Sequence, residues 1–154
     1  MSIRLVLDVS ALHGYANVDT ALAVGELIRE IREGGNHDQV GIPASGFLAA
    51  YTTTNDAGRA LLANLVADVE LARLRQDPHQ SMFAILPLTS ADVTDTGDLE
   101  LSWPGRGQAI IEALRHDAVL ATFEPREEAS PRLDIVDLGG GSAEDTGWNV
   151  TDPA

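Results

Sequence analysis

Short apolar runs alternate along this chain with segments of helical periodicity, and this alternation restricts the fold more than any other feature. The runs predict five strands, at residues 3–8, 39–45, 82–88, 118–124 and 132–138. Such alternation is typical of a mainly parallel sheet wrapped by helices. The sequence therefore predicts an α/β domain over residues 1–138 with a central, mainly parallel five-stranded sheet. The polar, glycine-led residues 139–154 predict a flexible acidic tail.

Several segments between these runs have the signals of helices. Residues 19–33 carry apolar side chains at i, i+3, i+4 and i+7, which predicts an amphipathic helix. Residues 46–51 suit a short helix. Asn55 or Asp56 is suited to cap the helix that follows. A proline in the first turn predicts a further helix over residues 104–116.

Composition and charge exclude several classes of function. The chain has 154 residues and no cysteine, which excludes disulfides, thiolate metal sites and cysteine nucleophiles. Its net charge of −14 comes from 24 acidic and 10 basic residues. Such a surface repels nucleic-acid phosphates unless a local basic patch or a bridging metal ion is present. Because the sequence shows neither signal-peptide features nor an apolar run of membrane-spanning length, we expect a cytoplasmic protein without a membrane partner.

Acidic residues stand at the ends of predicted strands, where a buried charge would otherwise be costly. Asp8 ends the first strand, Glu124 ends the fourth, and Asp92 follows the third. In open α/β sheets, ligands bind outside the carboxyl ends of the strands. Carboxylates that converge there would hold Mg²⁺ or Mn²⁺, and the metal would activate a water for phosphodiester attack. A simpler alternative for Asp8 is that it caps the helix that follows.

Three stretches together resemble a known family. They read RLVLDVSAL near the start, VGIPASGFLAAY in the middle and ALRHDAVLATFEPREEASPRLDIVDL near the end. In order and spacing they are similar to the PIN domain, the fold of VapC-type toxin ribonucleases and related metal-dependent nucleases. The resemblance implies a three-layer α/β/α sandwich and about four acidic residues that hold Mg²⁺ or Mn²⁺ to hydrolyse RNA. It also implies a homodimer and, for a toxin, an antitoxin partner.

The resemblance transfers only part of that acidic cluster. Asp8 matches the first acid, Ser10 the hydroxyl residue two positions later, and Glu124 the last acid. Catalytic and metal-binding roles are thereby implied for Asp8 and Glu124, and a binding role for Ser10. The second acid is absent, because residues 49–50 are alanines. The third falls at or near Arg106, whose positive charge repels a cation.

Two hypotheses follow. The first is a PIN-like domain that has lost nuclease competence and acts as an interaction or regulatory module, with Arg106 paired to Asp8 or Glu124. The second is a metal-dependent ribonuclease, for which RNA is a partner, with an unconventional acid set: Asp8 and Glu124, helped by Asp92, Glu112 or Asp117. The first predicts an arginine beside Asp8, and the second predicts three converging carboxylates.

Two further features are candidates for binding. PGRGQA, at residues 104–109, opens a helix and would offer backbone amides to an anion, with Arg106 beside it. The histidines lack the spacing of metal ligands. His13 follows the first strand closely and is the histidine expected nearest the pocket.

Overall fold

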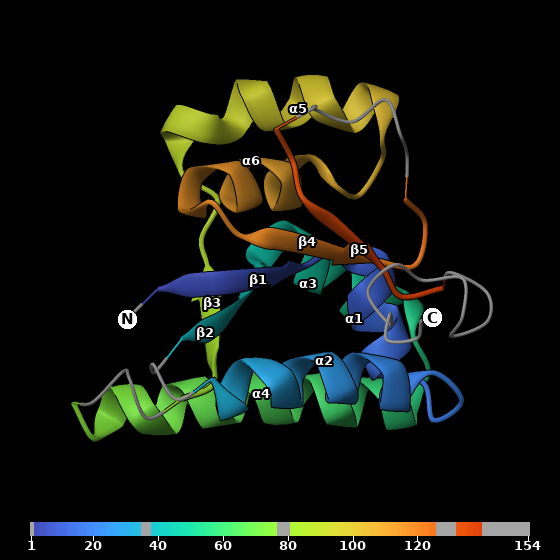
Figure 1. Cartoon of the computed structure of the whole chain (residues 1–154), viewed down its shortest axis with the longest axis vertical. Helices are drawn as coiled ribbons and strands as arrows, with labels where there is room; N and C mark the ends of the chain where they lie inside the picture. The colour runs from blue at the N-terminus through green and yellow to red at the C-terminus, as the bar shows by residue number, and fades with distance from the viewer. Residues whose placement is uncertain (1, 35–37, 77–80, 126–131, 140–154) are drawn as a thin grey trace.

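The centre of the molecule is a five-stranded sheet in which every pairing is parallel (Figure 1). The computed structural model describes residues 2–34, 38–76, 81–125 and 132–139, so the predicted tail lies almost wholly outside the described residues. The strand order is β3-β2-β1-β4-β5. The strands are β1 (Ile3–Leu7), β2 (Gln39–Pro43), β3 (Phe83–Leu86), β4 (Val119–Thr122) and β5 (Ile135–Asp137). The predicted α/β fold with five strands is confirmed.

Helices cover both sides of this sheet. Figure 1 shows α5 and α6 on one side, with α2 and α4 on the other. The helices are α1 (Val9–Tyr15), α2 (Ala21–Glu33), α3 (Ala44–Thr53), α4 (Asp56–Leu74), α5 (Val93–Ser102) and α6 (Gly107–His116). A short 3₁₀ turn, η2 (Ser90–Asp92), precedes α5. None of the helices in the described part of the chain combines the length and the apolar character that a membrane crossing needs.

The predicted helices are present, but some of their bounds differ from the prediction and one helix was not predicted. Asn55 caps α4 by accepting a hydrogen bond from the backbone of Gly58 at 2.8 Å. Helix α5 was not predicted, because it is mostly polar and Thr96 is its buried residue. The prediction that the last helix begins at Pro104 was wrong. Gly105 has a φ of +83°, which interrupts the helical path, and α6 begins only at Gly107.

The sheet separates two apolar clusters. In β1, Leu5 and Leu7 point into the cluster that includes α1, α2 and α4, whereas Val6 points into the cluster that includes α6. Because both faces are buried from Leu5 to Leu7, this part of β1 reads as a continuous apolar run rather than an alternating one. The sequence signal of the strand is therefore a consequence of its central position.

The strand order places the end of β1 at the switch point of the sheet. From β1 the chain builds one side with β2 and β3, and the other with β4 and β5. Ligands of open α/β sheets bind at such a point, outside the carboxyl ends of the strands. Asp8 directly follows β1 and Glu124 follows β4 by two residues, so both lie at this edge.

Candidate functional site

Asp8 is completely buried, and both of its carboxylate oxygens have partners. Oδ1 accepts hydrogen bonds from the Ala11 backbone at 2.8 Å and from the Ser10 hydroxyl at 2.7 Å. Oδ2 accepts from Nε of Arg106 at 3.0 Å. Asp8 is therefore the N-cap of α1, as the simpler prediction held, and it also forms a buried ion pair at the carboxyl edge of the sheet.

Arg106 lies immediately before α6, and its side chain is only 9% exposed. Besides the bond to Asp8, Nη1 donates to the carbonyl oxygen of Pro104 at 2.9 Å, and Nη2 donates to Oε1 of Glu124. The guanidinium carbon lies 5.8 Å from the centre of the Trp103 ring. The arginine thus joins the two carboxylates that the sequence placed at this edge, which are 116 residues apart.

Ser10 fastens the start of α1 to the end of β4. Its hydroxyl lies 3.1 Å from Oγ1 of Thr122 and accepts a hydrogen bond from the Phe123 backbone at 2.9 Å. Oγ1 of Thr122 in turn accepts from the backbone of Glu124 at 3.0 Å. Through these bonds Ser10 fixes the relative positions of Asp8 and Glu124. The side chain of Glu124 is 65% exposed, so the cluster opens to solvent on that side.

Asp92, predicted as a third metal ligand, does not join this cluster. Its Oδ2 accepts from Nη2 of Arg115 at 2.6 Å, and Arg115 also bonds Glu112 at 2.9 Å. Arg115 lies in the last turn of α6 and Arg106 precedes the first, which separates them by about 13 Å along the helix. Asp92 lies apart from Asp8 because it follows β3, an edge strand, after which the chain turns to the far end of α6.

The predicted anion site at the start of α6 is filled by the chain itself. Oε1 of Glu100 accepts from the Gly105 backbone and Oε2 accepts from the Gly107 backbone, both at 2.7 Å. An acidic group is favoured there by the unsatisfied amides and the positive end of the helix dipole. Sequence reasoning missed Glu100, because it is five residues before the first amide that it caps and carries no helix-capping signal.

Gln108 is a second residue that the sequence did not indicate. It is buried, and its Oε1 accepts from the Ser45 backbone at 2.9 Å while Nε2 donates to the carbonyl oxygen of Leu86 at 2.7 Å. It therefore ties the start of α3 and the end of β3 to α6. The one available signal is a polar side chain in an otherwise apolar stretch of the helix.

These residues do not fit a Mg²⁺ or Mn²⁺ site. A cation at Asp8 would have to displace a guanidinium that bonds both carboxylates. Within the described ranges, no group of three or more His, Asp and Glu side chains is placed to hold a metal ion. The cluster is arranged for structural ion pairing, because every oxygen of Asp8 is already hydrogen-bonded.

Comparison with known proteins assigns the chain to no family. No protein-family model matches the chain, and no curated protein matches its sequence. The functional conclusion therefore depends on the residues of the site and on their contacts.

Proposed function

We propose that this chain is a PIN-like α/β/α domain in which an arginine-centred ion-pair cluster replaces the metal site, and that it acts as an interaction module rather than as a nuclease. The observation that carries this proposal is the position of Arg106. Its guanidinium bonds Asp8 and Glu124, the two acids that match the family pattern. The strand order and the helices on both sides of the sheet are compatible with that family.

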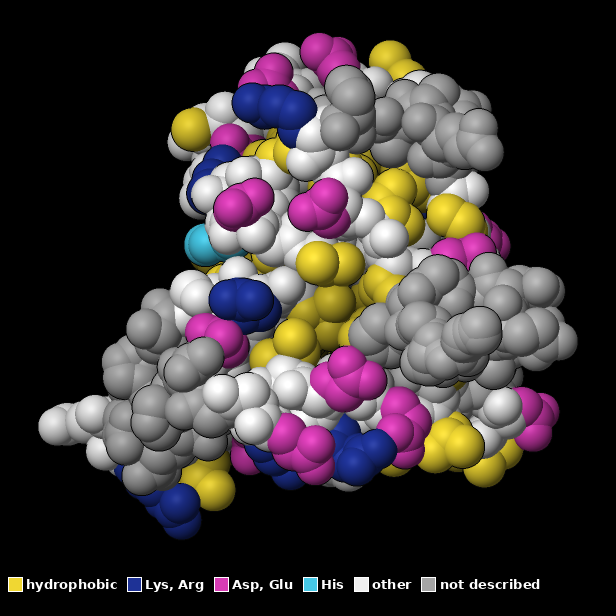
Figure 2. Space-filling model, viewed as in Figure 1, with side chains coloured by type: hydrophobic (Ala, Val, Ile, Leu, Met, Phe, Trp, Pro, Cys, Tyr) yellow, Lys and Arg dark blue, Asp and Glu magenta, His cyan; other side chains and the backbone are white. Residues whose placement is uncertain are grey.

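The distribution of arginines supports a partner other than RNA. Within the described part of the chain, the arginines that form ion pairs with the chain's own carboxylates include Arg4, Arg29, Arg59, Arg73, Arg106 and Arg115. On the face seen in Figure 2, most basic side chains lie beside acidic ones. An RNA phosphate that approached one of these arginines would meet the negative charge of its carboxylate partner. With a net charge of −14, electrostatics oppose the approach of RNA as well.

The proposal makes the partner a protein. The resemblance to PIN-like toxins suggests a second copy of the chain or an antitoxin. Light scattering during size-exclusion chromatography separates these two cases, because a homodimer elutes with twice the mass of 16.3 kDa without any added partner.

Titration calorimetry with Mn²⁺ at neutral pH tests the loss of the metal site. We expect no binding by the parent protein or by Asp8→Asn at millimolar metal. Binding by the parent that disappears in Asp8→Asn would contradict the proposal and favour the ribonuclease, which a cleavage assay on single-stranded RNA would then examine. Circular dichroism verifies that the variant is folded.

Arg106→Asp serves as the positive control for that titration. This variant removes the guanidinium and brings a third carboxylate to the edge that holds Asp8 and Glu124. Mg²⁺ and Mn²⁺ prefer such oxygen ligands. We expect the variant to gain Mn²⁺ binding, and its signal would show that the calorimeter detects a site of this kind.

A further inference from the structure

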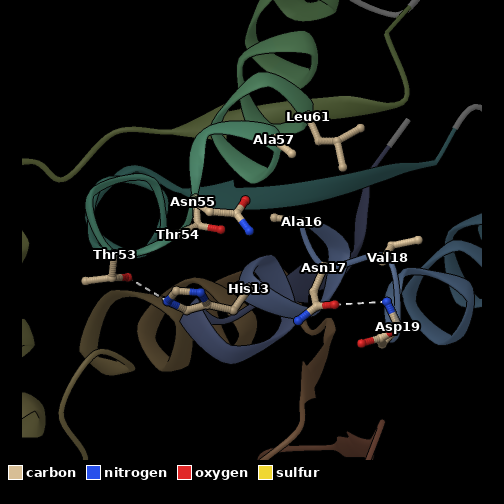
Figure 3. Close-up of a pocket in the computed structure, with 10 residues that line it drawn as sticks. All are labelled: His13, Ala16, Asn17, Val18, Asp19, Thr53, Thr54, Asn55, Ala57 and Leu61. Atoms are coloured by element: carbon tan, nitrogen blue, oxygen red, sulfur yellow. Dashed lines mark hydrogen bonds between the residues drawn. The ribbon is translucent and has the colours of Figure 1, made fainter.

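A hollow lies away from the Asp8 cluster, between the α1–α2 junction and the α3–α4 turn. It has a volume of about 590 Å³ and is lined by residues from 13–19 and 53–61 (Figure 3). This volume is within the range of about 300–1,000 Å³ that is usual for ligand pockets. His13 lies here rather than at the carboxyl cluster. The polar groups of the hollow divide into hydrogen-bond acceptors and donors.

The acceptors are His13 and Asp19. The Thr53 hydroxyl has one proton, which it donates to the Ala49 carbonyl oxygen at 2.7 Å. When the hydroxyl makes this bond, it accepts from Nε2 of His13, which lies 2.7 Å away, and Nδ1 of the neutral ring keeps the lone pair. Figure 3 shows this second ring nitrogen on the side of Thr54 and Asn55. Asp19 forms no ion pair within the described part of the chain, and the lining includes no arginine.

The donors are two side-chain amides whose orientations are fixed by the backbone. Oδ1 of Asn17 accepts from the Asp19 backbone at 2.9 Å, and Oδ1 of Asn55 accepts from the Gly58 backbone at 2.8 Å. Each amide therefore keeps its NH₂ group for a ligand. Asn55 also stands at the N-terminus of α4, where the helix dipole favours an acceptor such as a carbonyl oxygen.

Two large apolar side chains lie among these polar groups. Val18 is 88% exposed and Leu61 is 40% exposed, and both line the hollow. Leu22, at the start of α2, is 74% exposed. In α4 the buried leucines are Leu62 and Leu65, whereas Leu61 lies at the surface. Exposed apolar side chains around a polar hollow are typical of a surface that another protein covers.

We propose that this hollow receives an arginine or lysine side chain from an extended segment of a protein partner. The Asp19 carboxylate accepts hydrogen bonds from the cation. The amides of Asn17 and Asn55 donate to backbone carbonyl oxygens of the segment, and its apolar neighbours pack on Val18 and Leu61. The net charge of −14 favours a basic partner. This inference names the partner chemistry of the proposed interaction module and rests on that proposal.

The test is an NMR titration of the ¹⁵N-labelled full chain with blocked peptides. The main probe is leucyl-arginyl-leucine amide. We expect it to move the amide resonances of residues 13–19 and 53–61. Its citrulline analogue, which is neutral and has nearly the same shape, should bind about 1.5- to 5-fold more weakly, because an exposed ion pair contributes a factor in about that range. Blocked arginine alone should bind more weakly than the tripeptide, because it lacks the apolar neighbours.

Variants assign the effect to the hollow. Asp19→Asn should reduce arginyl-peptide affinity to that of the citrulline peptide, whereas Asp98→Asn, an exposed acid on α5, should not change it. The inference is overturned if the resonances of 13–19 and 53–61 do not move or if Asp19→Asn binds like the parent. Equal affinity for blocked arginine and the tripeptide would also overturn it, since the site would then be one for small cations. These results are independent of the Mn²⁺ titration, which alone decides the loss of the metal site.

Discussion

Nε of Arg106 lies 3.0 Å from Oδ2 of Asp8, although 98 positions separate the two residues in the chain. The bond joins the end of the central strand to the start of α6. A buried pair of this kind returns little net stability, because both charges lose their hydration, but the removal of one partner leaves an uncompensated charge. The pair therefore fixes how α6 meets the sheet more than it adds to the free energy of unfolding.

Asp8→Asn should lower the free energy of unfolding by about 3 kcal/mol. Asparagine still caps α1, so the loss reports the missing charge beside the buried Arg106 guanidinium. Urea denaturation at neutral pH measures it. Asp98→Asn is the matched control, and a surface change of this type should stay within about 0.5 kcal/mol. If the two variants were equally stable, the ion pair would have no role in holding the fold.

Gly105→Ala should destabilise the protein by about 1–2 kcal/mol. Gly105 has a φ of +83°, and an added Cβ would lie 2.8 Å from Cγ1 of Val9. Gly97→Ala in α5 is the opposite case, since nothing lies within 4 Å of the added Cβ. There alanine should stabilise the helix by about 0.5–1 kcal/mol. Thermal unfolding of the two variants should therefore shift in opposite directions, and shifts of the same sign would contradict this reading of the loop.

Glu100→Ala should lower the free energy of unfolding by about 1–2 kcal/mol, since it removes the acceptor for two backbone amides. Hydrogen exchange should also become faster at the amides of Gly105 and Gly107, which bond Glu100. Asp98→Asn, on the same helix, should leave the exchange at both glycines unchanged. Unchanged exchange in the alanine variant would show that Glu100 is not their protecting partner.

Stability should fall in alkaline solution through Tyr15. Partial burial raises the pKa of Tyr15 above its ordinary value of 10.0. Below pH 10.0 both states keep the proton; above it, the unfolded chain loses the proton first, so unfolding becomes more favourable as pH rises through the folded-state pKa. Urea denaturation at several pH values measures this loss of stability. Tyr15→Phe should lose less stability than the parent as pH rises, whereas Tyr51→Phe, which keeps Tyr15, should lose as much as the parent. An unchanged decline in Tyr15→Phe would exclude Tyr15 as its source.

The sheet could be predicted from the sequence because central parallel strands must be apolar on both faces. Helix α5 was missed for the converse reason, since it buries little and its residues lack an apolar stripe. The start of α6 was misplaced because proline at a first turn is only a preference. The positive φ of Gly105 depends on tertiary contacts, such as that with Val9, which no local pattern reveals.

The candidate site was predictable where strand ends determine it. Asp8 and Glu124 follow adjacent parallel strands, so their convergence follows from the order of the sheet. The first of the two hypotheses predicted that Arg106 pairs with Asp8 or Glu124. The structure places its guanidinium between these two carboxylates. The prediction that Asp92 lies beside Asp8 and Glu124 was wrong, because the residues of an edge strand do not determine the path of the chain after it. Glu100 and Gln108 act on backbone groups that only the folded chain brings near.

The central place of β1 has a consequence for how the protein is made. Leu5 pairs with Val119, so one side of the first strand stays without its neighbour until most of the chain has left the ribosome. At a synthesis rate of roughly 5–20 residues per second, that interval lasts roughly 6–23 seconds. An apolar strand with one open edge is a target for aggregation and for chaperones during this time. Nascent chains that end before β4 should therefore bind chaperones, and chains that include it should be released.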